Sequence, residues 1–414
     1  MTPEVKERIE QLRHGIVPEG YKRTKSGIYP EDWTEYTLGD IYTERKEPGN
    51  ESLPLLMVSI HSGVSDGEVD EADLPKKVKR IEDKSQYKRA ATGDLVFNML
   101  RAWQGAIGTV RTEGMVSPAY IVAEPNKLVA PLFMDYLMRT PRMVGTIHKQ
   151  SYGVTDFRLR LYWHSFAPIH CVSPSVPEQE KIGEAVDIQN KIIDLKEKLL
   201  AEKQRQKKYL MQQLLTDRMR LPGFDGEWMY VRANQIFRNV TDKKHNGTLE
   251  VLSATQDRGI IPRSLVDIDI KYAVESLTGY KKVAKGNFVI SLRSFQGGIE
   301  YSEYSGIVSP AYTVLSSIYP IEDNYYKQFF KSTDYINRLN IAVYGIRDGK
   351  QISYNDFGRI RIPYPPLDEQ KAIAAVLETA DKEIEILKRN IEQEKQKKKA
   401  LMQLLLTGIV RVNK

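Results

Sequence analysis

Two short segments combine side chains that can read the edge of a nucleic-acid base. They are residues 101–105, RAWQG, and residues 293–297, RSFQG. Arginine and glutamine make bidentate hydrogen bonds with guanine and adenine, and glycine lets the backbone come close to a ligand. The alternative is that the two aromatic residues belong to a core and the arginines are merely solvated. The candidate contacts here are Arg101, Trp103, Gln104, Arg293, Phe295 and Gln296.

A second pair of segments carries a high density of polar residues beside a repeated Tyr-Gly. These segments are residues 149–160, KQSYGVTDFRLR, and residues 344–351, YGIRDGKQ. Their lysines and arginines suit phosphate groups, while glutamine and threonine could reach bases. The candidate contacts are Lys149, Gln150, Tyr152, Thr155, Arg158, Tyr344, Arg347, Lys350 and Gln351.

Motifs for catalysis are missing. The chain has no glycine-rich cofactor loop, no GxxxxGK[ST] phosphate loop, and no HExxH or CxxC. Residues 364–367, YPPL, have the wrong order for the catalytic stretch of an adenine methyltransferase. The six histidines show no metal-ligand spacing. We therefore predict no catalytic residue and no metal site. The sequence does not exclude one alternative, a nuclease site that the fold assembles from scattered carboxylates.

Composition sets broad limits on the protein. A chain of 414 residues predicts two or three domains. The 61 basic and 54 acidic residues leave a net charge of +7, which points mildly to polyanionic partners. The single cysteine, Cys171, excludes a disulfide framework and fits a reducing cytoplasm. No signal peptide and no apolar run near 18 residues is found, so we predict a cytoplasmic protein without a membrane span.

The longest repeated feature is a helical stretch that occurs twice. Residues 178–216 align without a gap to residues 369–407, and both end in a block of type LMQ(Q/L)LLT. Their apolar residues recur at alternating steps of three and four, which is typical of a coiled-coil seam. Two such helices with imperfect seams are expected to pack against each other.

Further matches show that the globular parts are also repeated. SPAY at residues 117–120 recurs at residues 309–312. The order is therefore globule, helix, globule, helix. We predict an N-terminal helix at 1–17, a first domain at 18–177, a first long helix at 178–216, a second domain at 217–368, and a second long helix with a tail at 369–414.

Three motifs resemble the specificity subunits of type I restriction–modification enzymes. They are the entry PxGYKxTxxGxxPxDW at residues 18–33, the helix start PPxxEQ at residues 365–370, and the ending LMQxLLTG at residues 401–408. The looser helix start at residues 174–179 departs from the pattern. The resemblance implies an α+β fold with two globular α/β target-recognition domains, separated by two long antiparallel helices that form a coiled coil.

The same resemblance implies the function and the partners. Each domain would read one half of a bipartite double-stranded DNA target, and the helices would hold two methyltransferase subunits, joined by restriction/translocase subunits. S-adenosylmethionine, ATP and Mg are expected on those partners, with no cofactor on this chain. Two competing hypotheses are a coiled-coil adaptor that binds no DNA and a stand-alone nuclease or methyltransferase.

Overall fold

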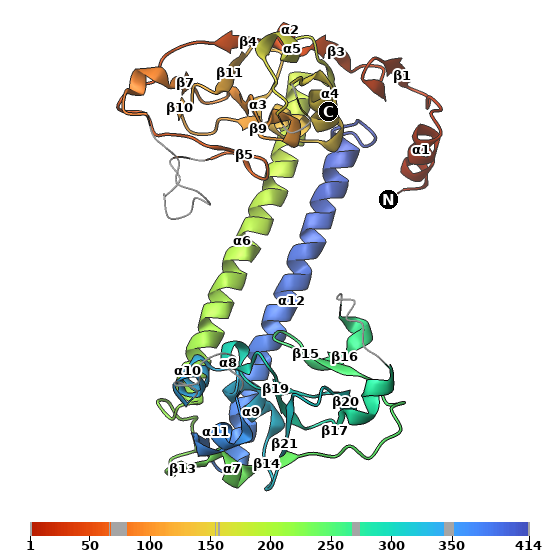
Figure 1. Cartoon of the computed structure of the whole chain (residues 1–414). Helices are drawn as coiled ribbons and strands as arrows, with labels where there is room; N and C mark the ends of the chain where they lie inside the picture. Colours follow the sequence, from red (N-terminus) through yellow and green to blue (C-terminus); the bar gives the residue numbers. More distant parts are fainter. Residues whose placement is uncertain are drawn as a thin grey trace. The chain divides into compact units, whose positions relative to one another are not determined.

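The computed structural model divides the chain into two compact units (Figure 1). Residues 2–65, 67, 81–153, 155, 158–266, 274–342 and 352–412 are described. Unit 1 comprises Met1–Lys196 with Asn390–Lys414, and unit 2 comprises Glu197–Arg389. Each unit thus contains one globular part and one half of each of two long helices, α6 (Val176–Leu214) and α12 (Leu367–Leu405).

Unit 1 is built on a four-stranded antiparallel sheet. Its strand order is β4 (Tyr42–Arg45), β11 (Tyr120–Pro125), β8 (Leu95–Asn98) and β9 (Ile107–Thr109). Four two-stranded ladders surround it: β1 (Tyr21–Thr24) with β2 (Gly27–Pro30), β3 (Thr34–Thr37) with β12 (His170–Ser173), β5 (Val58–Ser59) with β6 (Gly63–Val64), and β7 (Lys88–Ala90) with β10 (Gly114–Val116). The helices are α1 (Pro3–Arg13), α2 (Leu38–Ile41), η2 (Lys84–Gln86), η3 (Ala102–Gln104), α3 (Pro131–Met138), α4 (Pro141–Gln150) and α5 (Trp163–Phe166).

Unit 2 repeats the four-stranded sheet and three of the four ladders, and among the described residues only the β1–β2 ladder of unit 1 has no counterpart there. Its sheet has the order β14 (Phe237–Val240), β21 (Thr313–Ser317), β18 (Phe288–Ile290) and β19 (Glu300–Tyr301). Its ladders are β13 (Met229–Arg232) with β22 (Arg361–Tyr364), β15 (Leu252–Thr255) with β16 (Gly259–Pro262), and β17 (Lys281–Val283) with β20 (Gly306–Val308). Its helices are α7 (Ala233–Ile236), η4 (Arg263–Leu265), η5 (Val274–Gly279), α8 (Ser294–Gly297), α9 (Asp323–Phe329), α10 (Thr333–Ala342) and α11 (Tyr354–Arg359). The predicted internal repeat is therefore a repeat of the fold.

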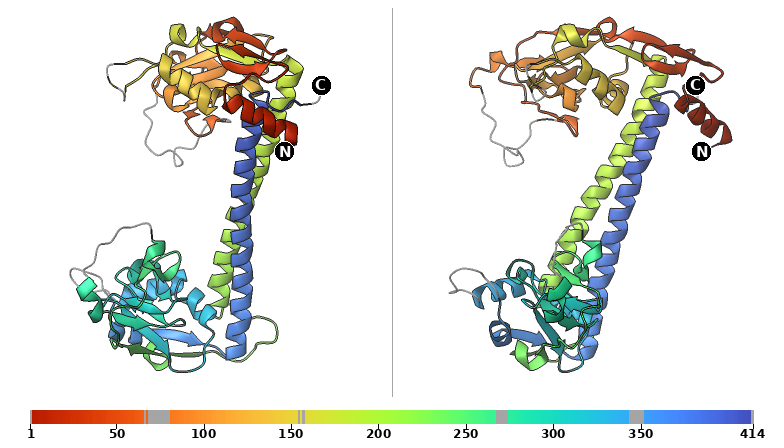
Figure 2. Two further views of the ribbon diagram at one scale, coloured as in Figure 1. Left: turned by 90° about the vertical axis from the view of Figure 1, so that its right-hand side faces the viewer. Right: turned by 45° about the vertical axis from the view of Figure 1, so that its right-hand side comes forward.

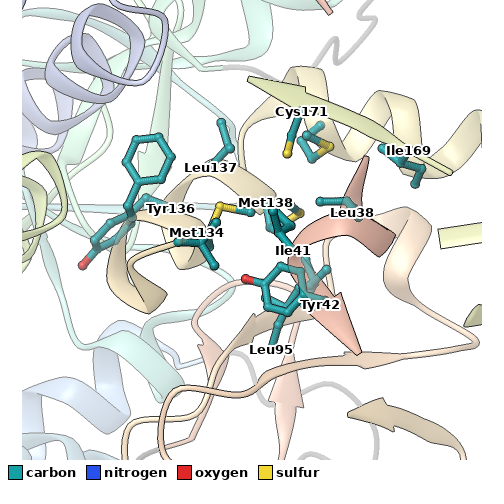
Figure 3. Packing of buried hydrophobic residues seen from close by; sticks show 14 of the residues in the cluster. Leu38, Ile41, Tyr42, Leu95, Met134, Tyr136, Leu137, Met138, Ile169 and Cys171 are labelled. Atoms are coloured by element: carbon teal, nitrogen blue, oxygen red, sulfur yellow. The ribbon is translucent and has the colours of Figure 1, made fainter. Parts of the chain in front are cut away.

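Apolar side chains of helices and strands form the core of unit 1. Figure 3 shows Met134 and Met138 of α3 among residues of α2 and of the sheet. Cys171 lies in the same cluster, and burial raises the pKa of its thiol to about 12. This environment suits an unreactive structural thiol, which agrees with the absence of a disulfide framework in the sequence.

Aromatic rings dominate the core of unit 2. Phe237 packs edge-on against Tyr326, with 5.2 Å between the ring centroids, and against Phe288 at 5.5 Å. Such edge-to-face contacts stabilise a core beyond the area that they bury. The core therefore differs in composition from that of unit 1, although both support the same strand order.

The long helices pack antiparallel within each unit, as Figure 2 illustrates. In unit 1, Val186 and Ile193 of α6 and Ile391 of α12 are buried, and in unit 2 Leu377 and Ile384 of α12 are buried. These residues belong to the seam that the sequence predicts. The structure confirms two long helices paired through heptad-spaced apolar residues.

Polar residues of the seam form ion pairs and hydrogen bonds between the helices. In unit 1, Gln189 Nε2 lies 2.8 Å from Glu394 Oε2, and Lys196 Nζ lies 2.9 Å from Glu394 Oε1. In unit 2, Lys207 Nζ lies 2.6 Å from Asp381 Oδ1, and Lys203 pairs with Glu383. A wrong register would leave these half-buried groups without partners, so polar pairs fix the alignment of the helices.

The Glu-Gln pair at the start of each long helix joins it to its globular part. The Gln179 side chain accepts from Ala130 N and donates to Pro174 O, and the Gln370 side chain accepts from Glu322 N. Both glutamine side chains are completely buried. Hydrogen bonds to buried backbone groups explain why the EQ motif occurs in both repeats.

The glutamates of the same motif bind arginines that follow the opposite long helix. Glu178 pairs with Arg411 in unit 1, and Arg411 also binds Asp32 at 2.8 Å. Glu369 pairs with Arg220 in unit 2, at 2.7 and 2.9 Å. The guanidinium groups lie over Trp33 and Trp228 respectively. Each unit therefore contains the same arginine–glutamate–tryptophan junction.

The C-terminal segment completes the globular part of unit 1. Tyr21 Oη donates to Gly408 O at 2.7 Å, and Arg8 of α1 donates to Ile409 O at 2.6 Å. A Cβ on Gly408 would lie 2.6 Å from side-chain atoms of Pro30, and its φ of 70° also favours glycine. The glycine that follows the second long helix thus packs closely against the entry segment.

Arg411→Ala should destabilise unit 1, because it leaves the Glu178 carboxylate buried without a counterion. Breaking a buried ion pair by removing one partner costs roughly 3–5 kcal/mol. We expect a value near the lower end, since 30% of the Arg411 side chain is exposed. The thermal midpoint and the hydrogen exchange of β1 would measure the effect. Adding Glu178→Gln should recover part of the loss, and a double variant as unstable as Arg411→Ala would contradict this explanation.

Acid should weaken the helix pair through Glu394. Hydrogen bonds from Lys196 and Gln189 lower the pKa of Glu394 to about 2, from an ordinary value of 4.5. A carboxylate with a pKa lowered by folding contributes stability that is present above pH 4.5 and is lost as the pH falls toward 2. The thermal midpoint should therefore fall less steeply over this range in Glu394→Gln than in the wild type. Glu392→Gln, an exposed change on the same helix, should retain the wild-type slope; equal slopes in all three proteins would exclude Glu394 as the cause.

Candidate nucleic-acid interface

The first predicted segment of unit 1 forms an exposed loop with an aromatic anchor. Arg101 and Gln104 are exposed at the two sides of η3. Trp103 is half-buried, its Nε1 donates to Leu100 O at 3.0 Å, and its ring lies 5.6 Å from that of His148 in α4. Gly105 has a φ of 101°, which favours glycine at the end of the turn. The tryptophan therefore holds the loop, while arginine and glutamine face solvent.

The equivalent segment of unit 2 has the same division of roles. Arg293 and Gln296 are exposed, whereas Phe295 in α8 packs against the core of the unit. Ser291 N donates to Ser294 Oγ at 2.8 Å, which ties the loop to its own first turn. The alternative that the aromatic residues belong to a core holds for Phe295, whereas Trp103 packs against His148 outside the core clusters. The arginine and glutamine of both loops are exposed and remain available to a ligand.

The second predicted segment of unit 1 lies beside the first. Lys149 and Gln150 are exposed at the end of α4, directly after the histidine that contacts Trp103. Tyr152 is 49% exposed, and its hydroxyl lies 2.9 Å from His164 Nε2. The backbone N–H of Tyr152 donates to the carbonyl of Arg160, and the N–H of Arg160 donates to the carbonyl of Tyr152. These two hydrogen bonds bring both ends of the segment together.

Thr155 and Arg158 are exposed within this returning segment. Arg158 N donates to Thr155 O at 2.9 Å. The structure therefore brings the two candidate segments of unit 1 together on neighbouring elements, η3 and α4. Their separation along the chain hides this proximity from the sequence.

In unit 2 the second predicted segment lies outside the described residues. It contains Tyr344, Arg347, Lys350 and Gln351, which follow α10. Helix α10 packs against α8, as α4 packs against η3 in unit 1. The part of the chain that is described thus shows the same pairing of loop and helix in both units.

Sequence reasoning missed a third exposed element, the tip of a β-hairpin in each unit. The tip between β5 and β6 consists of Ile60, His61 and Ser62, and the tip between β15 and β16 consists of Gln256, Asp257 and Arg258. All six residues are exposed. The only local signal is a Ser or Thr four residues before a glycine, as in Ser59 and Gly63, and such spacing is common in turns.

A buried ion pair lies next to the hairpin tip of unit 2. Lys331 Nζ pairs with Glu300 Oε1 at 2.5 Å, and only 3% of the Glu300 side chain is exposed. Burial raises the pKa of Glu300, while the charge of Lys331 and its hydrogen bond act in the opposite direction. In unit 1, the corresponding region holds an ion pair between Arg139 and Asp135. Neither pair forms a metal site, since no group of three His, Cys, Asp or Glu side chains that could hold a metal converges within the described residues.

Comparison with known proteins places these features in a family. Residues 226–395 match the type I restriction modification DNA specificity domain. The chain is 25% identical to the putative type I restriction enzyme MjaX specificity subunit of Methanocaldococcus jannaschii, over 95% of this chain and 97% of that protein. It is 29% identical to the type I restriction enzyme EcoBI specificity subunit of Escherichia coli, over 39% of this chain and 35% of the other.

Solved structures show the same fold. The HsdS subunit from Thermoanaerobacter tengcongensis matches with a TM-score of 0.51 and 19% identity, over 92% of this chain and 98% of that one. The type I S subunit from M. genitalium matches with a TM-score of 0.54 and 12% identity, over 90% and 96% of the two chains. Residues 226–395 thus match a type I DNA specificity domain, and nearly the whole chain is similar to type I restriction–modification specificity subunits.

This specificity subunit is the non-catalytic, DNA-specificity member of a type I system. The resemblance drawn from its sequence motifs is confirmed. No helix among its described residues is long and apolar enough to cross a membrane. Its matched domain covers the globular part of unit 2, and the fold repeat extends the same architecture to unit 1.

Gly298→Ala should damage the Arg293–Gly298 loop of this specificity subunit. A Cβ at Gly298 would overlap the carbonyl oxygen of Phe330, and the φ of 80° is unfavourable for alanine. Strain and overpacking together should cost roughly 2 kcal/mol or more, measured as the fall in the thermal midpoint of unit 2. Gly226→Ala is the matched control because nothing lies within 4 Å of its Cβ position. Equal midpoints for the two variants would show that the loop adapts to the added group.

Proposed function

We propose that this specificity subunit reads a bipartite double-stranded DNA target, with unit 1 and unit 2 each recognising one half. The observation that carries the proposal is the repeated scaffold, in which the paired loops keep an exposed arginine and glutamine while the exposed hairpin tips, Ile60–Ser62 and Gln256–Arg258, differ. Both units have one strand order and one loop-and-helix pairing. A shared scaffold provides the same mode of binding, and different side chains provide different base preferences.

The exposed residues divide by chemistry into two roles in this proposal. Arg101, Gln104, Arg293 and Gln296 read bases, because guanidinium and amide groups match the edges of guanine and adenine. In unit 1, Lys149 and Arg158 contact phosphates, which positions the unit without reading sequence. Trp103 and Phe295 hold the loops in place. Gln150, Tyr152 and Thr155 are exposed in the same region and extend the surface of unit 1.

The long helices are proposed to hold the catalytic partners. An internal repeat offers two equivalent docking surfaces, which suits two copies of one methyltransferase subunit. Restriction/translocase subunits would join that assembly. S-adenosylmethionine, ATP and Mg would bind to those partners, because this chain has no glycine-rich cofactor loop and no phosphate-binding loop.

Co-expression with the modification subunits tests the proposal. A gel shift with duplex DNA, and mapping of methylated sites, should show one bipartite target for the complex. An adaptor that binds no DNA would leave the shift of the modification subunits unchanged and would give no site preference.

Arg101→Ala and Arg293→Ala should each alter recognition of only one half of the target. A lost base contact costs about 1–3 kcal/mol at one position, whereas a lost phosphate contact weakens binding to all sequences and lowers the salt slope by about one. Methylation-site mapping and salt titration of the assembled enzyme distinguish these cases. Arg13→Ala, an exposed change in α1, is the control and should match the wild type. If Arg101→Ala and Arg293→Ala also show the site preference and salt slope of the wild type, the loops do not contact DNA.

A further inference from the structure

The hairpin tip of unit 2 is held in one conformation by its own hydrogen bonds. Thr255 Oγ1 donates to Gly259 O at 2.9 Å and accepts from Arg258 N at 3.2 Å. Gly259 has a φ of 72°, and a Cβ there would lie 2.6 Å from Tyr301 O. The three tip residues therefore project from a turn whose shape is set by its neighbours.

The tip lies directly against the predicted reading loop. The Cβ position of Gly297 is 3.0–3.1 Å from three side-chain atoms of Gln256. A larger residue at Gly297 would push Gln256 away, so the glycine in RSFQG has a structural reason. The tip and the loop are separated in sequence but approach each other at Gln256 and Gly297, and Gln256, Arg293 and Gln296 are all exposed.

The side chain of Lys331 connects the hairpin tip to the predicted reading loop. Its Nζ donates to Gly297 O of the loop at 2.8 Å and to Gln256 O of the tip at 3.2 Å. The same ammonium group pairs with the buried Glu300. One ammonium group thus has three acceptors on three different segments, and it fixes their relative positions.

The side chains on the tip have the chemistry of base readers. Glutamine pairs with adenine through two hydrogen bonds, arginine with guanine, and aspartate accepts from the amino group of cytosine. The tip of unit 1 has the same three-residue length and a glycine of φ 78° at Gly63, and His61 N donates to Ser59 Oγ. Its residues Ile60, His61 and Ser62 differ chemically from those of unit 2. Equal length and a shared glycine of positive φ, combined with unequal side chains, are what two elements with different base preferences require.

We propose that Gln256–Arg258 is a base-reading element of unit 2, that Ile60–Ser62 is its counterpart in unit 1, and that Lys331 is the positioning residue that aligns the tip and loop of unit 2. The inference rests on the proposed reading of DNA by both units. It assigns part of the specificity to residues that no sequence motif identifies.

Selective methylation of a duplex library tests the proposal. The library carries randomised bases in both half-sites and is methylated by this chain assembled with its modification subunits. Gln256→Ala and Arg258→Ala should each reduce discrimination by roughly 5- to 150-fold at one or two base pairs. The affected base pairs should lie in the half-site that Arg293→Ala changes. His61→Ala should affect only the half-site that Arg101→Ala changes.

Arg238→Ala is the matched control for the tip of unit 2. Arg238 is exposed on β14, at the edge of the sheet opposite β19, whereas the hairpin packs beside β19. The complex that carries Arg238→Ala should have the same base preferences as the wild-type complex. Unchanged preferences in both tip variants, or equal relaxation in both half-sites, would overturn the inference. A wild-type complex without any base preference would instead refute the proposed function itself.

Lys331 requires its own comparison because Glu300 must not be left as an unpaired buried charge. Lys331→Met is therefore made together with Glu300→Gln, and Glu300→Gln alone is the control. The double variant should lose discrimination at the base pairs read by both the tip and the loop, and Lys331→Arg should largely retain it. A double variant with a lower thermal midpoint but wild-type base preferences would reduce Lys331 to a purely structural role.

Discussion

A buried glutamate in the first turn of each long helix imposes the constraint on which the architecture depends. A buried carboxylate is costly unless a counterion and hydrogen bonds accompany it. In both units the counterion is an arginine that follows the opposite long helix, Arg411 for Glu178 and Arg220 for Glu369. The start of one helix is therefore bound to the end of the other within each unit. This requirement explains why residues near both termini belong to unit 1.

The polar seam adds a second condition to the same arrangement. A purely apolar helix pair could slip by a heptad at little cost, but Lys196 and Gln189 reach Glu394 in only one alignment. Similar pairs occur in unit 2 between Lys207 and Asp381. The scaffold is thus specified by charges and amides, while apolar residues supply most of its stability.

The two repeats differ in the side chains of their cores and hairpin tips, while the strand order of the scaffold stays the same. The two sheets share one strand order, yet one core is rich in methionine and aliphatic residues and the other in aromatic rings. The two hairpin tips also keep a three-residue length and a glycine with positive φ while their side chains change. Gly63 and Gly259 preserve the turn, and Ile60 is exchanged for Gln256. Such a division lets recognition change without loss of the fold.

The sequence by itself determined the repeat, the two long helices, their polar and apolar seam, and the family, because these features rest on periodicity and on motifs within short stretches. It also predicted Arg101 and Arg293 as candidate contacts, because their loops have a local glycine signal. Only the tertiary structure decided that Trp103 anchors its loop, that Arg411 neutralises Glu178, and that Lys331 joins Gln256 to Gly297. These contacts connect residues far apart in the chain, and their geometry depends on how strands and helices pack, which residue spacing does not encode.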